Sequence, residues 1–241
     1  MFSRFVITAL AVTPLLAQAP PEFRQPRELS PGVFEIGAVR LDKNANTVKF
    51  PARVNMDDGL LEYLMVSPQG PVHESLLVSE VPPQEVHMAM LLLGAKGMTK
   101  PQTGAGSGRI DQASLAKAPK LTGDRILITV TWKDKAGKEQ TVPIERWLVR
   151  KIFTPRKPEK SVPAEDGPWL YTGSYFYENR FVAQIEGAFG SLVTYPGALI
   201  NNPRAGSTDD HIWFVNKKAA PPVATPVEFT IKLEPAEKPA K

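Results

Sequence analysis

The sequence predicts a β-rich α+β domain, mainly an antiparallel sheet or sandwich with one packed helix. Short segments alternate apolar and polar residues, as in residues 48–54, which is typical of half-buried strands. Turn-forming residues separate these segments, as in Asp57-Asp58-Gly59. One apolar segment, at about residues 82–94, has helical spacing instead.

The helix is expected at residues 82–94. Pro82 and Pro83 suit its first turn, where a missing N–H costs nothing, and Glu85 complements the positive end of the helix dipole. Gly94 provides a stop at the C-terminal end. Because the segment is apolar on nearly every side, we expect this helix to pack against the sheet.

The strands are expected along most of the remaining chain. Their predicted ranges are residues 48–54, 60–66, 72–79, 125–132, 140–149, 169–177, 181–186, 192–195, 211–215 and 227–233. Pro51 cannot donate to a ladder, which predicts an edge strand or a bulge at that position. Residues 151–168 are rich in proline and charge and are expected to form a long surface loop.

The N-terminus has the three parts of a cleavable signal peptide, predicted at residues 1–19. Arg4 gives a positive start, residues 5–16 are apolar, and Ala17-Gln18-Ala19 supplies small residues for cleavage. An apolar run of about 12 residues is shorter than the roughly 20 that cross a bilayer. We therefore expect an exported protein, periplasmic or secreted, with no transmembrane span after cleavage.

The composition of the rest of the chain predicts its segments and excludes several functional classes. A proline-rich leader at residues 20–31 precedes a single domain at residues 32–233, and a disordered tail follows at residues 234–241. The chain has no cysteine, which excludes thiol chemistry, cysteine metal sites and a lipid anchor. The net charge of +4 is spread along the chain, so no nucleic-acid partner is expected.

Several motifs occur in the order found in a known family. They lie at residues 50–56, 59–64, 73–78, 87–94, 171–177, 186–187, 191–192, 201–204, 209–210 and 213–214. Together they resemble the YdjY-like domain of exported bacterial proteins. The resemblance implies one domain, export and a bacterial source. It implies no catalytic residues, because the family is functionally uncharacterised.

His73, Glu74 and Ser75 are the first candidate site. On a strand, His73 and Ser75 would share one face with their Cβ atoms about 7 Å apart, and Glu74 would face the other way. That separation is too large for a ready-made nucleophile and base. The alternative is that these side chains hydrogen-bond to neighbouring strands or pair with a basic group.

A metal site is the second candidate. The chain has three histidines, His73, His87 and His211, and a zinc site needs three protein ligands or more. His73 and His87 could converge with a carboxylate of Glu62, Glu74 or Asp210. Alternatively, His87 bonds backbone or solvent near the start of the helix. No cofactor is predicted, and a zinc or calcium ion stays open as an alternative.

Two further features complete the candidate residues. Asn201, Asn202, Asp209 and Asp210 offer the oxygen ligands that calcium prefers, although such residues also shape turns by bonding their own backbone, and the loop could also rim a binding site. Glu186, in the Glu186-Gly187 motif, is the remaining candidate.

The aromatic residues of 169–177 suggest a surface for ligands. Tyr171, Tyr175 and Tyr177 would share one face of a strand, as a stacking platform for sugars or peptides. The alternative is packing across strands.

Two functions follow from these observations. The first is a non-enzymatic envelope module that binds an envelope protein, a glycan or a peptide, since no catalytic signature is present. The second is a hydrolase or metal-dependent enzyme that uses His73, Glu74, Ser75, His87 and the Asp209-Asp210 loop.

Overall fold

The structure is a computed structural model that describes residues 24–98, 121–156 and 158–235. The expected signal peptide, the first residues of the leader and most of the expected tail lie outside the described residues. The strands, helices and contacts below all belong to the described part of the chain.

Strands dominate the described chain. They are β1 (Arg27–Ser30), β2 (Val33–Ile36), β3 (Val39–Asp42), β4 (Thr47–Val54), β5 (Tyr63–Val66), β6 (Ser75–Val78), β7 (Asp124–Lys133), β8 (Glu139–Pro143), β9 (Leu148–Ile152), β10 (Lys160–Pro163), β11 (Trp169–Tyr171), β12 (Phe176–Tyr177), β13 (Arg180–Phe181), β14 (Ala188–Ser191), β15 (Ile200–Asn201), β16 (Trp213–Val215) and β17 (Pro226–Leu233). The helices are α1 (Pro83–Leu93) and α3 (Val182–Glu186), and the 3-10 turns are η1 (Val72–Glu74) and η2 (Ile144–Trp147). Helix makes up 12% of the structure, which confirms the β-rich class.

Eight strands close into a mixed barrel. Their order is β4-β17-β7-β11-β15-β14-β5-β6, and β6 pairs back to β4. Most pairs are antiparallel, but β5–β6 and β14–β15 are parallel. The predicted, mainly antiparallel strand pairing is therefore present, but the strands form a mixed barrel and not a simple antiparallel sandwich. Apolar alternation predicted the strands and not the closure, because a sandwich and a barrel both bury one face of each strand.

The strand predicted at residues 72–79 is shorter in the structure, where β6 pairs in parallel with β5. Residues 72–74 form η1 instead, and this turn brings the chain back to the start of β5, where Tyr63 pairs with Ser75. Strand periodicity gives no direction of travel, so the connection between the strands decided this pairing.

Pro51 marks a change of partner along one edge of β4. The first residues of β4 pair with β3, whereas Arg53 and Val54 pair with β6. The Pro51 carbonyl lies on this edge and accepts a hydrogen bond from Ser79 Oγ at 2.7 Å. The predicted edge strand or bulge is corrected, because β4 lies inside the sheet. Pro51 lies between the residues that pair with β3 and those that pair with β6, so neither of these strands needs its missing N–H.

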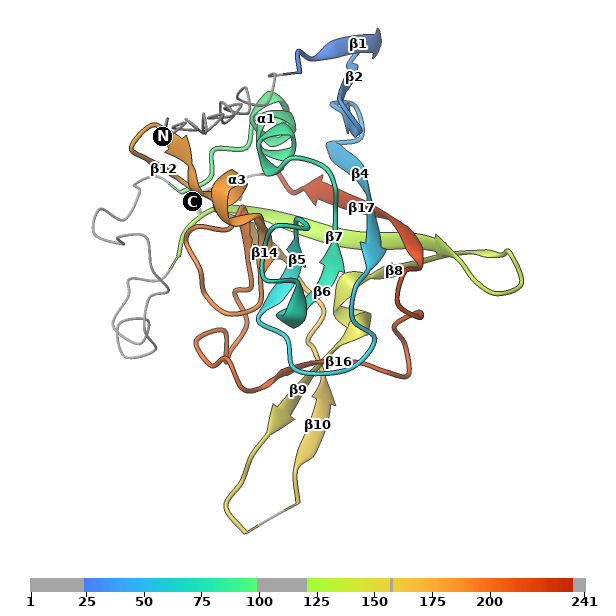
Figure 1. Cartoon of the computed structure of the whole chain (residues 1–241). Coiled ribbons are helices and arrows are strands. Elements are labelled where there is room, and N and C mark those ends of the chain that lie inside the picture. Colours follow the sequence, from blue (N-terminus) through green and yellow to red (C-terminus); the bar gives the residue numbers. More distant parts are fainter. Residues whose placement is uncertain (1–23, 99–120, 157, 236–241) are drawn as a thin grey trace, which may run out of the picture.

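Two extensions leave the barrel. β1, β2 and β3 continue the sheet beyond β4, so part of the expected leader, residues 27–30, is a strand. A separate sheet, β10-β9-β16, carries the β9–β10 hairpin away from the barrel (Figure 1). This hairpin replaces part of the surface loop predicted at residues 151–168.

The helix α1 confirms the prediction at residues 82–94. Pro83 occupies its first turn, and Gly94 ends it with a left-handed φ of +94°. The helix packs on β3 and β4, as expected for an apolar helix beside a sheet. No helix in the described residues is long and apolar enough to cross a membrane.

The segment predicted as a strand at residues 181–186 is largely the short helix α3. Gly187 ends this helix with a φ of +67°, a conformation that favours glycine. An added Cβ at Gly187 would also collide with Ser67 Oγ. Over so short a segment the apolar residues fit both the helical and the strand period. Gly187, which ends a helix here, distinguishes the two.

One hydrophobic core joins the barrel and the small sheet. Phe50 lies at its centre, with ring centroids 5.8 Å from Phe189 and 5.3 Å from Phe229. The same core includes the fully buried Trp169 on barrel strand β11 and Trp213 on sheet strand β16. The small sheet is therefore part of the same domain.

A buried ion pair lies at the junction of the barrel and the small sheet. Arg204 Nη2 lies 2.6 Å from Glu145 Oε1, and the two side chains are 8% and 2% exposed. Trp169 Nε1 donates to the same carboxylate oxygen at 2.8 Å, and the Arg204 guanidinium also donates to the carbonyl oxygens of Glu165 and Gly167. Burial raises the pKa of Glu145, and the charge of Arg204 opposes that rise.

Replacing Arg204 should destabilise the domain strongly. Arg204→Met leaves the Glu145 carboxylate buried without its cation, which costs about 3–5 kcal/mol of unfolding free energy in urea denaturation. Adding Glu145→Gln should restore part of the loss, because the amide is neutral and still accepts from Trp169. The control is Arg146→Met, which breaks the exposed pair with Asp166 and should cost about 0–1 kcal/mol. Equal losses for the two arginines would contradict this account.

Candidate functional site

His73, Glu74 and Ser75 do not lie together on a strand. His73 and Glu74 belong to η1, and the exposed His73 Nε2 lies 3.7 Å from the Glu74 carboxylate. Ser75 begins β6, is fully buried and donates to the Leu77 carbonyl at 2.8 Å. The predicted strand is wrong for His73 and Glu74, and the Ser75 hydroxyl serves the backbone, as the alternative expected.

His87 lies in α1, is partly buried and forms a hydrogen bond with the buried Tyr171. His87 Nδ1 lies 2.7 Å from the Tyr171 hydroxyl, and the Phe181 ring packs on the imidazole with centroids 4.7 Å apart. Burial lowers the pKa of His87 to about 4 and raises the pKa of Tyr171. The imidazole is therefore neutral at physiological pH, and its tautomer decides which partner donates in the bond to Tyr171.

Asn201 and Asn202 are buried and hold the neighbouring loop. Asn201 Oδ1 accepts the Tyr195 N–H at 2.7 Å, and Asn202 Nδ2 donates to the Leu192 carbonyl at 3.1 Å. Asn202 Oδ1 accepts from the backbone of Arg204. The amide oxygens already have protein donors, which favours the turn-forming interpretation over calcium binding.

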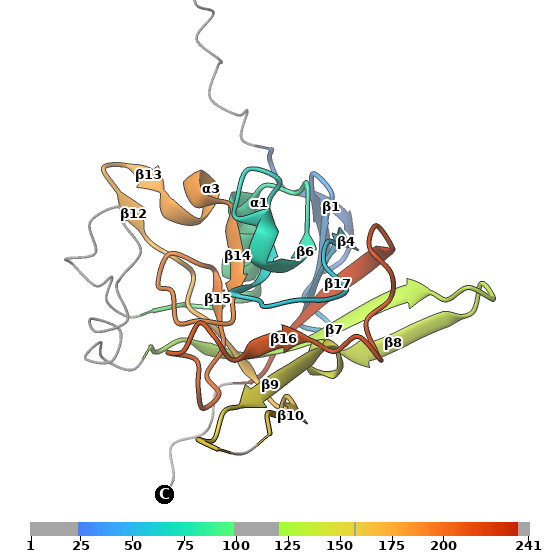
Figure 2. The same ribbon diagram turned by 60° about the horizontal axis from the view of Figure 1, so that its bottom comes forward.

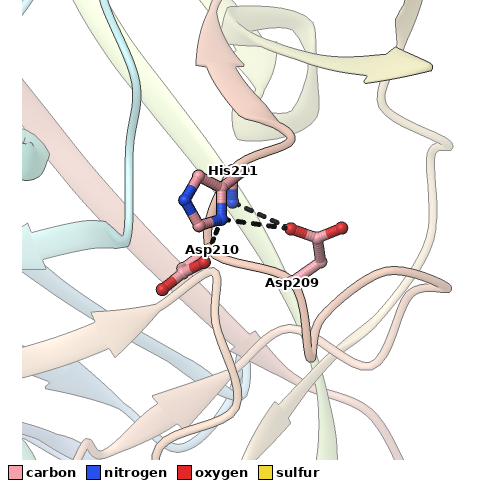
Figure 3. Close-up of side chains that lie close together, drawn as sticks. All are labelled: Asp209, Asp210 and His211. Carbon is pink, nitrogen blue, oxygen red and sulfur yellow. Dashed lines mark hydrogen bonds and ion pairs between the residues drawn. The ribbon is translucent and has the colours of Figure 1, made fainter. Parts of the chain in front are cut away.

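Asp209, Asp210 and His211 gather on the loop that precedes β16 (Figure 3). The carboxylate oxygens of Asp210 and Asp209 lie 2.5 Å and 3.8 Å from His211 Nδ1. Within the described chain this is the group whose three ligand atoms all fall within 4.8 Å of one another. His73 and His87 are not brought into such a group. His211 is 75% exposed, and its backbone N–H bonds Asp209, so the loop also has a turn-forming explanation.

Glu186 lines a hollow of about 320 Å³ between the β12–β13 hairpin and α3. The residues around it include Tyr175, Tyr177, Glu178, Arg180, Ile185 and Glu186. Two large side chains of this lining are exposed, Tyr177 at 45% and Ile185 at 46%, whereas the 65% exposed Phe176 lies on the hairpin outside the lining. Tyr171 is buried in the core, so only Tyr175 and Tyr177 of the predicted aromatic platform face this hollow.

The hairpin beside the hollow is held by a tight turn and an aromatic stack. Glu178 and Asn179 have φ angles of +47° and +60°, the left-handed pair of a two-residue hairpin turn. Phe176 packs on Phe181 with centroids 5.1 Å apart, and Phe181 packs on His87. His87 therefore supports the hairpin from beneath.

The helix α3 forms the other wall of the hollow. Ser174 Oγ accepts the Ala183 N–H at 3.1 Å and donates to the Gly197 carbonyl at 2.7 Å, which fixes the start of α3. Gln184 Oε1 accepts the backbone N–H of Gln84 at the start of α1. In both views of the ribbon, α3 and the hairpin lie beside α1, away from the β9–β10 hairpin (Figures 1 and 2).

The Glu186 carboxylate lies in the hollow without a cation. Burial raises the pKa of Glu186, and after burial itself the charge of Glu186 is what raises the pKa of Tyr175. No described residue donates a hydrogen bond to this carboxylate or forms an ion pair with it. The hollow therefore combines exposed aromatic and aliphatic surface with an unpaired acid.

Two other hollows have some of their charged residues paired within the protein. One, of about 270 Å³, is lined by Arg150 and Arg204, and Arg204 is bonded to Glu145 and two carbonyl groups. The other, of about 580 Å³, lies over the small sheet, where Lys151 pairs with Glu159 and Lys217 pairs with Asp58. Paired surface charges of this kind are common without a ligand.

A scan against protein families matches residues 39–232 to the YdjY domain. The chain belongs to the YdjY domain family. The match confirms the resemblance carried by the motifs, and the biochemical function of the domain is uncharacterised. Searches of curated proteins and of solved structures found no match.

Many of the YdjY motif residues stabilise the fold. Gly94 and Gly187 end helices in left-handed conformations, Asn202 holds the loop at Leu192, and Arg204 neutralises Glu145. The motifs at residues 87–94 and 201–204 therefore have a folding explanation. Glu186 differs from them, because no hydrogen bond or ion pair joins its carboxylate to another described residue.

Some residues that line the hollow between α3 and the β12–β13 hairpin were not predicted from the sequence. Arg180 and Ile185 were not candidates, because residues 178–180 were assigned to no element and residues 181–186 were predicted as a plain strand. The Glu178-Asn179 pair was the available signal, since asparagine favours left-handed turn positions and two such residues can close a hairpin.

Removing His87 should change how stability depends on pH. Its folded pKa of about 4 lies below the ordinary 6.5, so its contribution is complete above pH 6.5 and is lost as pH falls to 4. Wild type should lose about 3 kcal/mol of unfolding free energy relative to His87→Gln between pH 7.5 and pH 4, measured by urea denaturation. His73→Gln controls for the loss of an exposed histidine. Parallel curves for wild type and His87→Gln would contradict the assignment.

Proposed function

We propose that this YdjY domain is a non-enzymatic binding module of the cell envelope, which takes a peptide or glycan ligand at the hollow beside α3. The observation that carries the proposal is the pair of exposed side chains, Tyr177 and Ile185, that line a hollow of about 320 Å³. Aromatic and aliphatic side chains gathered at a concave site are typical of binding sites for small ligands and partner side chains.

Export is part of the same proposal. The signal-peptide pattern at residues 1–19 supports delivery to the periplasm or the medium, where envelope peptides, proteins and glycans are within reach. The N-terminal sequence of the protein recovered from its native host tests this step. A chain that still begins at Met1 would refute it.

The non-enzymatic assignment rests on how the candidate catalytic groups are placed. The buried Ser75 hydroxyl donates to the Leu77 carbonyl, and the partly buried His87 bonds Tyr171, so neither has the nucleophile and base geometry of a hydrolase. His73 is exposed beside Glu74. These placements favour binding over catalysis.

Truncating Tyr177 should weaken ligand binding. The purified mature domain is screened for binding to arrays of short peptides and of envelope glycans, and the best probe is titrated by calorimetry. Tyr177→Ala should lose about 2 kcal/mol of binding free energy, roughly thirtyfold in Kd, as is usual for a central aromatic contact.

A matched control lies at the other end of the molecule. Phe153 is 57% exposed after β9, so Phe153→Ala removes a similar exposed aromatic ring away from the hollow. It should bind like wild type. An equal effect of both variants, or no effect of Tyr177→Ala on any probe, would place binding elsewhere.

A metal-dependent enzyme is the second candidate function, and one observation favours it. Asp209, Asp210 and His211 offer three ligand atoms within 4.8 Å, the number that a catalytic zinc site takes from its protein. If this candidate holds, elemental analysis after zinc dialysis finds one zinc per chain, and His211→Ala loses it. His73→Ala is the control histidine. Zinc retained by His211→Ala, or absent from wild type, would remove this candidate.

A further inference from the structure

We propose that the hollow between α3 and the β12–β13 hairpin binds a lysine or arginine side chain of a peptide segment, with Glu186 as its counter-charge. This inference rests on the proposed binding function and names the ligand class. Three features of the hollow carry it: an unpaired acid, aromatic surface around that acid, and a small volume.

The first feature is the position of the Glu186 carboxylate. It is half-buried at the end of α3, and no described residue supplies a hydrogen bond or a cation to it. A carboxylate in such a place is poorly solvated, and this lowers the stability of the unbound protein. A cation that enters the hollow supplies the missing partner, and this favourable interaction contributes to the free energy of binding.

Two glutamates elsewhere on the chain show how an acid can be compensated within the domain. Glu145 is buried with Arg204 and Trp169 as partners, and Glu159 is paired with Lys151 at 2.9 Å. Within the described part of the chain Glu186 has neither kind of partner, although Arg180 lines the same hollow. The cation is therefore expected to come from outside the domain.

The second feature is the aromatic wall around this acid. Tyr175 and Tyr177 line the hollow with Glu186, and the Tyr175 phenol is close enough for the Glu186 charge to raise its pKa. The faces of tyrosine rings attract ammonium and guanidinium groups. The aliphatic stem of a lysine or arginine also buries well against Ile185 and the ring carbons.

The third feature is size. At about 320 Å³ the hollow lies at the low end of the roughly 300–1,000 Å³ of ligand sites, which suits one long side chain better than an oligosaccharide. Arg180 at the exposed rim can donate to carbonyl groups of a peptide backbone. Two acids, Glu178 and Glu186, face this single arginine, so the balance of charge favours a cationic guest.

Two matched peptides test the proposal. The probes are acetyl-Ala-Ala-Lys-Ala-Ala-amide and the same peptide with an acetylated lysine ε-amine, titrated into the isotope-labelled mature domain and followed by NMR. The lysine peptide should shift the resonances of residues 175–186, and lysine acetylation should weaken its binding at least tenfold. Glu186→Gln should weaken the lysine peptide at least tenfold and leave the acetylated peptide unchanged. Glu159→Gln, which removes a paired acid from another hollow, should bind like wild type.

The stability of Glu186→Gln gives a second readout. Because the carboxylate has no partner in the free domain, its replacement should raise Tm by about 2 °C or more. A lower Tm would show that Glu186 holds the fold together, and would overturn its assignment as a binding residue. Tyr177→Phe keeps the ring and should retain binding of the lysine peptide.

The outcomes separate this inference from the function on which it rests. If Tyr177→Ala abolishes peptide binding but Glu186→Gln does not, the counter-charge assignment is overturned and the binding module stands. The same holds if the lysine peptide fails to bind and a glycan such as chitotetraose binds at residues 175–186. If neither variant changes the binding of any probe, both proposals fail.

Discussion

Closure of the barrel is the constraint on which the rest of the structure depends. β4 pairs with β17 along one edge, and with β3 and then β6 along the other, so the backbone groups of eight strands are satisfied around a ring. The change of partner works because Pro51, which has no N–H, lies at the changeover. Once the ring is closed, the positions of the loops at its ends are fixed, and these loops carry α1, α3 and the β12–β13 hairpin.

The polar groups of the YdjY motifs act mainly inside this frame. Arg204 and Glu145 compensate each other where the small sheet meets the barrel, and Asn201 and Asn202 satisfy loop backbone that would otherwise be buried without partners. A family motif rich in asparagine, arginine and histidine thus has a physical explanation without catalysis, since each buried polar group needs a specific partner. Glu186 is the exception, and for that reason it carries the proposed recognition of a cation.

Part of the fold and part of the site could be predicted from the sequence. The helix at residues 82–94 was predictable because prolines, an apolar surface and Gly94 all indicate the same element. Glu186 and the pair Tyr175 and Tyr177 were also candidates, on motif and alternation alone. Ile185 was not, because a five-residue helix is too short for any period to identify it.

The sequence by itself determined the β-rich class, the main helix and membership of the YdjY family, because these depend on local periodicity and on motif order. Only the tertiary structure decided that the strands close into a mixed barrel, that His73 and His87 have separate partners, and that Glu186 faces an aromatic hollow without a cation. The reason is physical. Alternation specifies which side of a strand is buried, whereas the partner of each strand and of each buried polar group depends on contacts between residues far apart in the chain.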